Sequence, residues 1–290
     1  MKIAIIGLGH VGSTIAYTLQ GQKEISDIFL YDKQEDKLQA EYQDLRDGLI
    51  LSEYPEKNIV LNDYSALGSA DILIYCPGDI KVLEHESDRL AELRVTSRIT
   101  REIAPKISKS GFSGLIISIT NPCDVIAGYL KELLNYPAHK IIGSGTVLDT
   151  NRLRNALIDA DYDASKGMII GEHGETQVAV IDLDLSKSQK DELLSKSRYG
   201  GWSIFNVKKY TAFGIAPSVL YILKSIWNET GQPLPVSTYD SKEDIFYSYP
   251  TILSREGVVS KVDFPLMNDL SYKEELKKSI ERIRENKDTI

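Results

Sequence analysis

Residues 1–13 read MKIAIIGLGHVGS, an apolar run rich in isoleucine that stops at a glycine-rich turn. The run over residues 2–6 is too short for a helix, and its continuous apolar character suits a strand covered on both faces. Apolar positions after the turn recur at helical intervals. The stretch therefore predicts a strand that enters a helix in a doubly wound α/β fold.

The turn itself has G-x-G-x-x-G spacing, with Gly7, Gly9 and Gly12. The first glycine permits a tight turn, the second lets a pyrophosphate approach the backbone, and the third lets helix and strand pack closely. A second apolar run ends at Asp32, about twenty residues after the last glycine, where a carboxylate binds a ribose 2′-hydroxyl. The alternative is a solvated acid at a strand end. Because strand, turn, helix and strand agree, we predict binding of NAD rather than NADP.

The composition excludes several classes of protein. The chain has 290 residues, of which 42% are hydrophobic and 26% charged, enough for one large domain or two modest ones. A net charge of −8 and a pI near 5.2 give no basic surface for nucleic acid, and no apolar stretch approaches the length of a membrane span. Cys76 and Cys123 are the only cysteines and have no metal-type spacing. With no signal-peptide pattern, we expect a cytoplasmic protein with reduced thiols.

Strands and helices alternate through the first half of the chain, which predicts a parallel sheet with its ligand at the carboxyl ends of the strands. The strands expected after the first are residues 27–32, 59–61, 71–76, 114–119 and 139–142. The expected helices cover residues 33–49 and 89–108, and a further one ends near residue 134. We assign residues 1–146 to a dinucleotide-binding domain.

The second half has a different pattern, and we assign residues 147–290 to a substrate and catalytic domain. Its alternation predicts an α+β lobe with a mixed or antiparallel sheet. The expected helices are residues 148–160, 210–228 and 272–286. The expected strands are residues 168–170, 177–182, 234–238, 245–249 and 258–262.

Three residues of this second half suggest acid–base chemistry. His173 lies between two glycines directly after a buried strand, where the ring can face a cleft. A carboxylate such as Asp149 would fix the tautomer of the ring and stabilise the imidazolium. Arg152 follows three positions later on the same helix face and could grip a substrate carboxylate. The alternatives are a structural histidine and a surface ion pair.

Five motifs together, in order and spacing, resemble the lactate/malate dehydrogenase family over essentially the whole chain. They are the glycine turn with Asp32, TNP at 120–122, GSGT at 143–146, DTNR at 149–152 and IGEHG at 170–174. Within the family, residues 78–93 and 200–214 are most similar to the L-2-hydroxyisocaproate dehydrogenases. The resemblance implies a Rossmann domain and reversible hydride transfer between NADH and a 2-oxo acid. It also implies a homo-oligomer, either a dimer or a tetramer.

The resemblance assigns roles to the site residues and requires no metal. His173 exchanges a proton with the substrate oxygen and Asp149 orients it. Arg152 holds the substrate carboxylate, and Arg89 on a closing loop polarises the carbonyl. Two further contacts, beside the nicotinamide and to the substrate, are implied for Asn121 and Thr211.

The loop over residues 79–88 bears on the substrate. Ile80, Val82 and Leu83 stand where a dicarboxylate enzyme needs a cation, the loop is longer than is usual in lactate dehydrogenases, and Gly214 adds little bulk near Thr211. These features favour a 2-oxo acid with an apolar side chain, such as 2-oxoisocaproate. If the apolar residues only pack the closed loop against the protein, L-lactate dehydrogenase is the better description.

Other functions fit the sequence less well. We rank malate dehydrogenase third, because Lys81 is the loop's only cation at neutral pH and lies among acids. NAD-dependent glycosidases share the dinucleotide lobe, but they are longer and use a metal for which this sequence has no ligand cluster. A non-enzymatic NAD-sensing module needs only residues 7–32 and leaves His173, Asp149 and Arg152 without a role.

Overall fold

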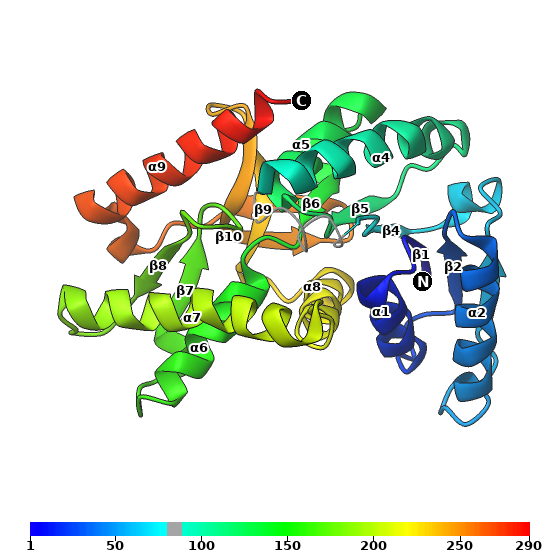
Figure 1. The fold of residues 1–290 in the computed structure, drawn as a ribbon, viewed down its shortest axis with the longest axis horizontal. Helices are drawn as coiled ribbons and strands as arrows, with labels where there is room; N and C mark the ends of the chain where they lie inside the picture. Colours follow the sequence, from blue (N-terminus) through cyan, green and yellow to red (C-terminus); the bar gives the residue numbers. More distant parts are fainter. Residues whose placement is uncertain (80–88) are drawn as a thin grey trace.

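One nine-stranded sheet organises the computed structural model, which describes residues 1–79 and 89–290 (Figure 1). Its strands lie in the order β11 (Gly257–Lys261), β10 (Ile245–Ser254), β9 (Leu234–Asp240), β6 (Ile141–Gly143), β5 (Leu115–Ser118), β4 (Ile72–Tyr75), β1 (Lys2–Ile6), β2 (Asp27–Tyr31) and β3 (Asn58–Leu61). The six strands from β6 to β3 are all parallel. The predicted doubly wound parallel sheet is confirmed.

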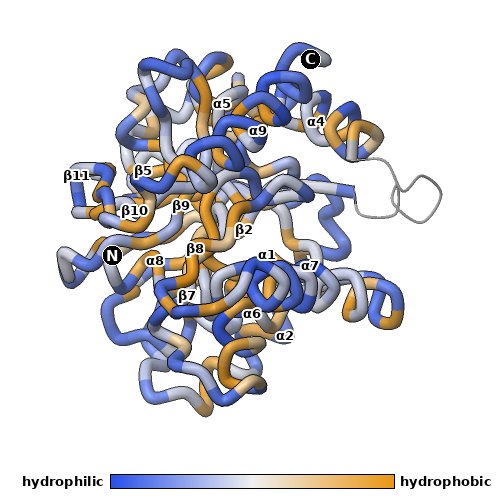
Figure 2. The backbone as a smooth tube through the Cα atoms, turned by 90° about the vertical axis from the view of Figure 1, so that its left-hand side faces the viewer, coloured by the Kyte–Doolittle hydropathy of each residue, from blue (hydrophilic) through white to orange (hydrophobic). Residues whose placement is uncertain are grey.

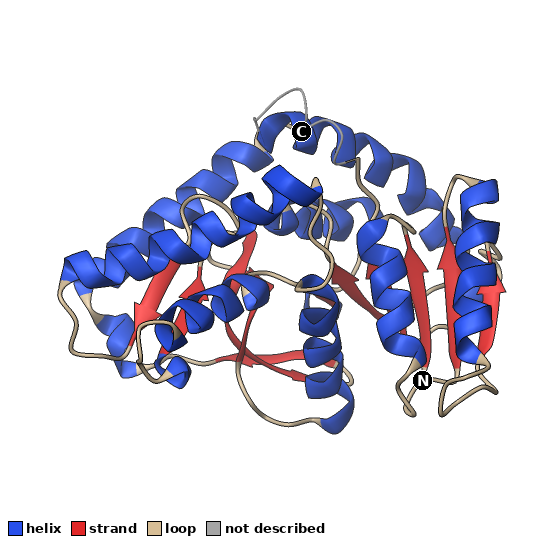
Figure 3. Cartoon of the chain, turned by 60° about the horizontal axis from the view of Figure 1, so that its bottom comes forward, coloured by secondary structure: helices blue, strands red, loops and turns tan. Residues whose placement is uncertain are grey.

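Helices cover both faces of this sheet (Figure 3). One face packs against α1 (His10–Gln20), α2 (Glu35–Leu49) and α8 (Ile215–Asn228), and the other against α4 (Arg89–Lys109), α5 (Cys123–Leu134) and α9 (Leu270–Lys287). Alternate residues of β1 enter different cores: Ile3 and Ile5 face the α1 side, while Ala4 and Ile6 face the α5 side. Helices bury both faces of the sheet at β1, which explains why apolar and polar residues do not alternate along this strand.

The apolar residues are concentrated in these two layers. In Figure 2 the strands near the centre of the view are mostly orange, and the outer helices carry most of the blue. Ile3 and Ile5 have 0% of their surface exposed. A fully buried side chain of this kind contributes about 1.5–3 kcal/mol. This buried core fixes the positions of the carboxyl ends of the parallel strands.

The strands of the second half are antiparallel, as expected, and they also extend the first-half sheet. The connection is a single pairing of β6 with β9, between Gly143 and Ser237. A Cβ at position 143 would lie 2.7 Å from the Ser237 Cβ, so the two strands approach this closely only because residue 143 is glycine. The boundary near residue 146 stays a prediction, since the sheet runs across it.

The remaining elements form a smaller layer beside the sheet. A two-stranded antiparallel sheet of β7 (Gly167–Ile170) and β8 (Val178–Ile181) packs with α6 (Val147–Ile158) and α7 (Lys187–Lys208). In the part of the chain that the structure describes, no helix is both long enough and apolar enough to cross a membrane.

The sequence-based assignment missed α7 and began α8 too early. We expected a helix over residues 210–228, but α8 begins at Ile215, and α7 occupies a segment to which we assigned no element. Helix α7 contains Gly200 and Gly201, which weaken helix propensity. A capping box between Ser186 and Gln189 starts it, and Lys209, at a φ of 65°, ends it.

Candidate active site

The glycine turn has the geometry that its spacing predicts. Gly7 has a φ of 95°, and a Cβ there would lie 2.8 Å from the Cys76 carbonyl carbon. A Cβ at Gly12 would lie 1.9 Å from the Gly7 carbonyl oxygen, so helix and strand contact each other directly. At Gly9, by contrast, no described heavy atom lies within 4 Å of a Cβ. The turn thus opens at the amino end of α1, where a pyrophosphate binds in such folds.

Asp32 lies beside this turn. Its Oδ2 accepts a 2.7 Å hydrogen bond from the Leu8 main-chain N–H, and its Oδ1 accepts one from Gln34 at 3.0 Å. These bonds hold the carboxylate at the end of β2, next to the residues that would receive the phosphates. The glycines and Asp32 together fit a dinucleotide whose ribose hydroxyls face an acid.

An aromatic contact joins this turn to the second half of the chain. The ring of His10, the first residue of α1, stacks on Tyr210 with 3.8 Å between centroids and 10° between planes. Tyr210 precedes Thr211 in the turn between α7 and α8, so the stack brings the Thr211 segment against the glycine turn. Sequence reasoning missed this contact, because about 200 residues separate its partners and no motif marks it.

His173 is carried by a fixed turn at the end of β7. Gly171 has a φ of 85° and exchanges main-chain hydrogen bonds with Ser248 of β10 at 2.8 and 2.9 Å. The Glu172 N–H donates to Ser279 Oγ of α9 at 2.6 Å. Two distant segments, β10 and α9, therefore fix the backbone just before the imidazole.

Asp149 brings His173 and Arg152 together. His173 Nδ1 lies 2.5 Å from Asp149 Oδ2, and Arg152 Nη1 donates to Asp149 Oδ1 at 2.9 Å. The Asp149 side chain is 4% exposed, whereas those of His173 and Arg152 are 19% and 18% exposed. A buried acid between a partly exposed histidine and a partly exposed arginine is unlike a surface ion pair. The structure thus assembles the three residues as the sequence suggested.

Helix α6 sets the position of Asp149. Thr146 Oγ1 at its N-cap donates to the Ile169 carbonyl at 2.5 Å, and Thr150 Oγ1 accepts from the Ile169 N–H at 2.9 Å. These bonds dock the start of α6 onto β7, which leads to His173. Asp149 lies in the first turn of the helix, where the helix dipole stabilises a carboxylate.

A glycine of α7 lies against the guanidinium of Arg152. A Cβ at Gly201 would lie 3.1–3.3 Å from the Arg152 Nη1, Cζ and Nη2 atoms. At Gly200 the nearest approach is 3.9 Å, to Arg152 Cδ, which is an ordinary contact. The absence of a side chain at residue 201 therefore keeps space beside Arg152. At Gly214, in contrast, a Cβ would lie 2.8 Å from Leu148 Cδ1, so the small size of this residue serves packing there.

A second buried acid contacts His173 and was missed by sequence reasoning. Asp124 Oδ2 accepts the His173 main-chain N–H at 2.9 Å, and its Oδ1 accepts the Ser237 hydroxyl at 2.5 Å. The Asp124 side chain is buried, and burial raises the pKa of its carboxyl to about 6 despite these two hydrogen bonds. An acid in the first turn of a helix after TNP is a visible signal, but only the fold brings it to residue 173.

The other predicted site residues are less closely defined. Asn121 is half-buried between the end of β5 and the start of α5. Arg89 is the first residue of α4, but its side chain lies outside the described residues, as do Ile80, Val82 and Leu83. Among the described residues, no group of three or more His, Cys, Asp or Glu side chains is placed to hold a metal ion.

Comparison with known proteins identifies both halves of the chain. Residues 1–143 match the lactate/malate dehydrogenase NAD binding domain, and residues 146–290 match the lactate/malate dehydrogenase alpha/beta C-terminal domain. An L-lactate dehydrogenase of Halalkalibacterium halodurans is 30% identical over 301 residues, which cover 98% of this chain and 96% of that protein. L-lactate dehydrogenase 2 of Lactococcus lactis subsp. lactis is 29% identical over 309 residues, with the same shares covered.

A solved structure agrees with these matches. The minor L-lactate dehydrogenase of Enterococcus mundtii, in its ligands-bound form, superposes with a TM-score of 0.90 at 28% identity, covering 100% of this chain and 98% of that one. The family resemblance and the expectation of NAD are confirmed, whereas the narrower likeness to L-2-hydroxyisocaproate dehydrogenases stays a prediction. The chain therefore belongs to the lactate/malate dehydrogenase family and is an NAD-dependent oxidoreductase that acts on a hydroxy acid.

Proposed function

We propose that this chain interconverts an L-2-hydroxy monocarboxylic acid and the corresponding 2-oxo acid. The observation that carries the proposal is the buried Asp149 carboxylate, which binds a histidine with one oxygen and an arginine with the other. A 2-oxo acid presents a carbonyl next to a carboxylate. A proton donor and a guanidinium held side by side match these two groups.

His173 is the proposed proton donor and acceptor. Its Nδ1 contacts Asp149, which assigns the Nδ1 proton to that hydrogen bond and leaves Nε2 to exchange a proton with the substrate oxygen. NAD, when bound, supplies the hydride acceptor, and NADH the donor. The ring must be protonated to reduce a 2-oxo acid and neutral to oxidise a hydroxy acid, because the same nitrogen gives the proton in one direction and takes it in the other.

Arg152 is the proposed carboxylate-binding residue. Its bond to Asp149 uses Nη1, and a guanidinium has five N–H donors in a fixed plane. A planar substrate carboxylate accepts two parallel bonds from such a group, which fixes its orientation as well as its position. The ion pair with Asp149 also orients the guanidinium, so less entropy is lost on binding.

Three further roles are proposed from the family resemblance. Arg89 would polarise the substrate carbonyl, Asn121 would lie beside the nicotinamide, and Thr211 would contact the substrate. The His10–Tyr210 stack supports the last role, because it brings the Thr211 segment to the side of the cofactor turn. We also propose that the protein is a homo-oligomer, as the family resemblance implies.

For the substrate we propose a 2-oxo acid with an apolar side chain larger than a methyl group. Within the described residues the support is Gly201, whose missing side chain leaves space beside Arg152. Ile80, Val82 and Leu83 add to it from the sequence. Pyruvate is the competing candidate, favoured by the relatives, which are named L-lactate dehydrogenases. Oxaloacetate is third, because the loop over residues 79–88 lacks an arginine.

A substrate panel tests the proposal. The ratio kcat/KM is measured for pyruvate, 2-oxobutyrate, 2-oxoisocaproate and oxaloacetate, each with NADH and with NADPH. We expect NADH to be strongly preferred, since Asp32 would repel a 2′-phosphate. Each buried methylene is worth about 1–3 kcal/mol, so 2-oxoisocaproate should exceed pyruvate by about tenfold or more.

Each of the other outcomes of the substrate panel would indicate a different function. Equal or greater efficiency with pyruvate makes this an L-lactate dehydrogenase, and a preference for oxaloacetate makes it a malate dehydrogenase. Binding of NADH without turnover of any 2-oxo acid would leave an NAD-binding module and refute the proposed chemistry.

A further inference from the structure

Two carboxylates, not one, hold His173. Asp149 binds its ring and Asp124 binds its main-chain N–H, and each acid lies in the first turn of its own helix. We propose that Asp124 is a positioning residue for the proton transfer, which anchors the backbone of His173 and adds a second negative charge that favours its imidazolium form. The inference rests on the proposed role of His173 and extends it.

A purely structural role leaves the charge of Asp124 unexplained. The residue is 3% exposed, and burying an ionised carboxylate is costly. An asparagine would accept the same N–H of His173 without that cost. The Ser237 hydroxyl, at 2.5 Å, and the amino end of α5 instead stabilise the ionised acid. These groups offset part of the cost of burial, so the pKa of Asp124 is raised only to about 6 and the carboxyl is ionised at neutral pH, where a neutral residue would satisfy the hydrogen bond.

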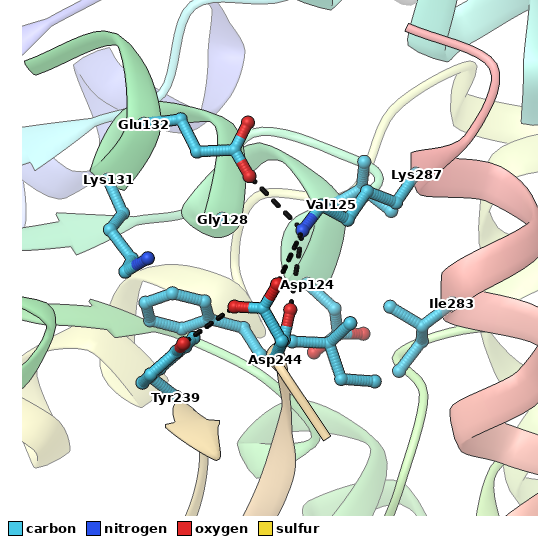
Figure 4. Close-up of a pocket in the computed structure, with 11 residues that line it drawn as sticks. Asp124, Val125, Gly128, Lys131, Glu132, Tyr239, Asp244, Ile283 and Lys287 are labelled. Carbon is cyan, nitrogen blue, oxygen red and sulfur yellow. Dashed lines mark hydrogen bonds and ion pairs between the residues drawn. The ribbon is translucent and has the colours of Figure 1, made fainter. Parts of the chain in front are cut away.

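The charges of Asp124 and His173 affect each other, because the two residues are in direct contact. A protonated His173 favours ionisation of Asp124 and lowers the pKa of that carboxyl, while the neighbouring Glu172 raises it. The charged groups that line a pocket together with Asp124 are Lys131, Glu132, Asp244 and Lys287 (Figure 4). Lys287 lies 3.1 Å from Glu132 and 3.7 Å from Asp244, so its charge is largely balanced by those two acids.

The test is a titration of the His173 ring in the Asp124→Asn protein. Asparagine retains an oxygen acceptor for the His173 N–H and removes the charge. The ring resonances are followed by NMR against pH in the full-length protein and identified by their loss in His173→Gln. Because the imidazolium loses one of two neighbouring anions, the midpoint should move to lower pH by about one unit. This readout does not require turnover, so it can fail while the proposed function stands.

The pH profile for 2-oxo acid reduction provides a second measurement. This direction requires a protonated ring, so kcat in the variant should begin to fall at lower pH, with the KM for NADH unchanged. Ser237→Ala should shift the midpoint the same way by a smaller amount, because Asp124 loses a donor that favours its ionised form. The matched control is Asp240→Asn, which removes a carboxylate from the same strand as Ser237 but one that pairs with Lys261, and it should leave the midpoint unchanged.

Two results would contradict the proposed role of Asp124. An Asp124→Asn protein that titrates with the normal midpoint overturns the proposal, even if it is slower or unfolds at lower temperature, because a merely structural acid predicts that pattern. A shift of equal size in Asp240→Asn also overturns it, because the effect would then be a general consequence of lost charge.

Discussion

A histidine serves as a proton donor only if one ring nitrogen is held and the other is left for the substrate. In this protein Asp149 holds Nδ1, and Asp149 is itself fixed by Arg152 and by the start of α6. The Ser197 hydroxyl of α7 also donates to the Asp149 main-chain carbonyl at 3.0 Å. The orientation of a single ring therefore depends on groups from two helices, α6 and α7.

Replacement of Asp149 by asparagine should impair catalysis in both directions. The amide can keep a hydrogen bond to the ring, but it removes the charge that fixes the tautomer and stabilises the imidazolium, so kcat should fall by about 10²- to 10⁴-fold. Rates of oxo acid reduction and hydroxy acid oxidation measure the effect. Asp182→Asn is the control, since that acid pairs with Lys166 on the surface. Near-normal turnover of the Asp149 variant would rule out the orienting role.

At the level of single residues, the sequence predicted what is local and missed what depends on distant contacts. Asp149 and Arg152 are three positions apart on one helix, so their pairing follows from helical periodicity. Asp124 lies 49 residues from His173, and Ser237 lies 113 residues from Asp124. Such distances carry no periodic signal, and only the pairing of strands and docking of helices define them.

Among the elements, helix α7 shows how a functional constraint can hide a helix from sequence reasoning. Glycine inside a helix costs about 1 kcal/mol relative to alanine, and two adjacent glycines argue against a helix. Yet a Cβ at Gly201 would lie only 3.1–3.3 Å from the guanidinium of Arg152, where α7 passes it. One of the two residues that weaken the helical pattern thus also keeps space beside Arg152, so helix propensity and the proposed function conflict at Gly201.

The two glycines of α7 therefore make a matched pair for substitution. Both Gly200→Ala and Gly201→Ala should stabilise the helix by about 0.5–1 kcal/mol before any clash. At residue 201 the new methyl group lies 3.1 Å from Arg152 Nη1, and Arg152 cannot move freely because Asp149 holds it. We expect Gly201→Ala to raise KM for 2-oxo acids, most for large side chains, and Gly200→Ala to leave it unchanged. Equal kinetics in both variants would show that the missing side chain at residue 201 does not determine the size of substrate that binds.

Across the whole molecule, the parallel sheet was predictable and its continuation was not. Buried apolar strands alternating with helices predict that the strands now seen from β6 to β3 form a parallel sheet, because each crossover must be covered. The attachment of β9 to β6 depends on the close approach of Gly143 to Ser237, which no pattern in the sequence predicts. This attachment brings Ser237 to Asp124 and so links the carboxy-terminal strands to the proposed site.

The three strands that extend the sheet meet at Asp240, which should make the stability of the whole molecule depend on pH. Its carboxylate binds Lys261 of β11 at 3.0 Å and Tyr247 of β10 at 3.0 Å. Burial opposes ionisation, but Lys261 and the main-chain N–H groups of residues 242 and 243 outweigh it and lower the pKa of Asp240 to about 2. The native carboxyl thus binds its proton less tightly than the unfolded chain, whose value is 3.8. Stabilisation is therefore complete above the unfolded value and is lost as pH falls towards 2.

We expect Asp240→Asn to reduce the free energy of unfolding by about 2 kcal/mol at neutral pH. Urea unfolding measured at several pH values should show a constant loss above about pH 5 and a loss about half as large near pH 3, because the unfolded chain takes up a proton at Asp240 there while most of the native protein does not. Asp182→Asn, in an exposed pair with Lys166, should change stability by less than about 0.5 kcal/mol. A loss in Asp240→Asn that stays the same at every pH would mean that the hydrogen-bond geometry, and not the charge, joins the three strands.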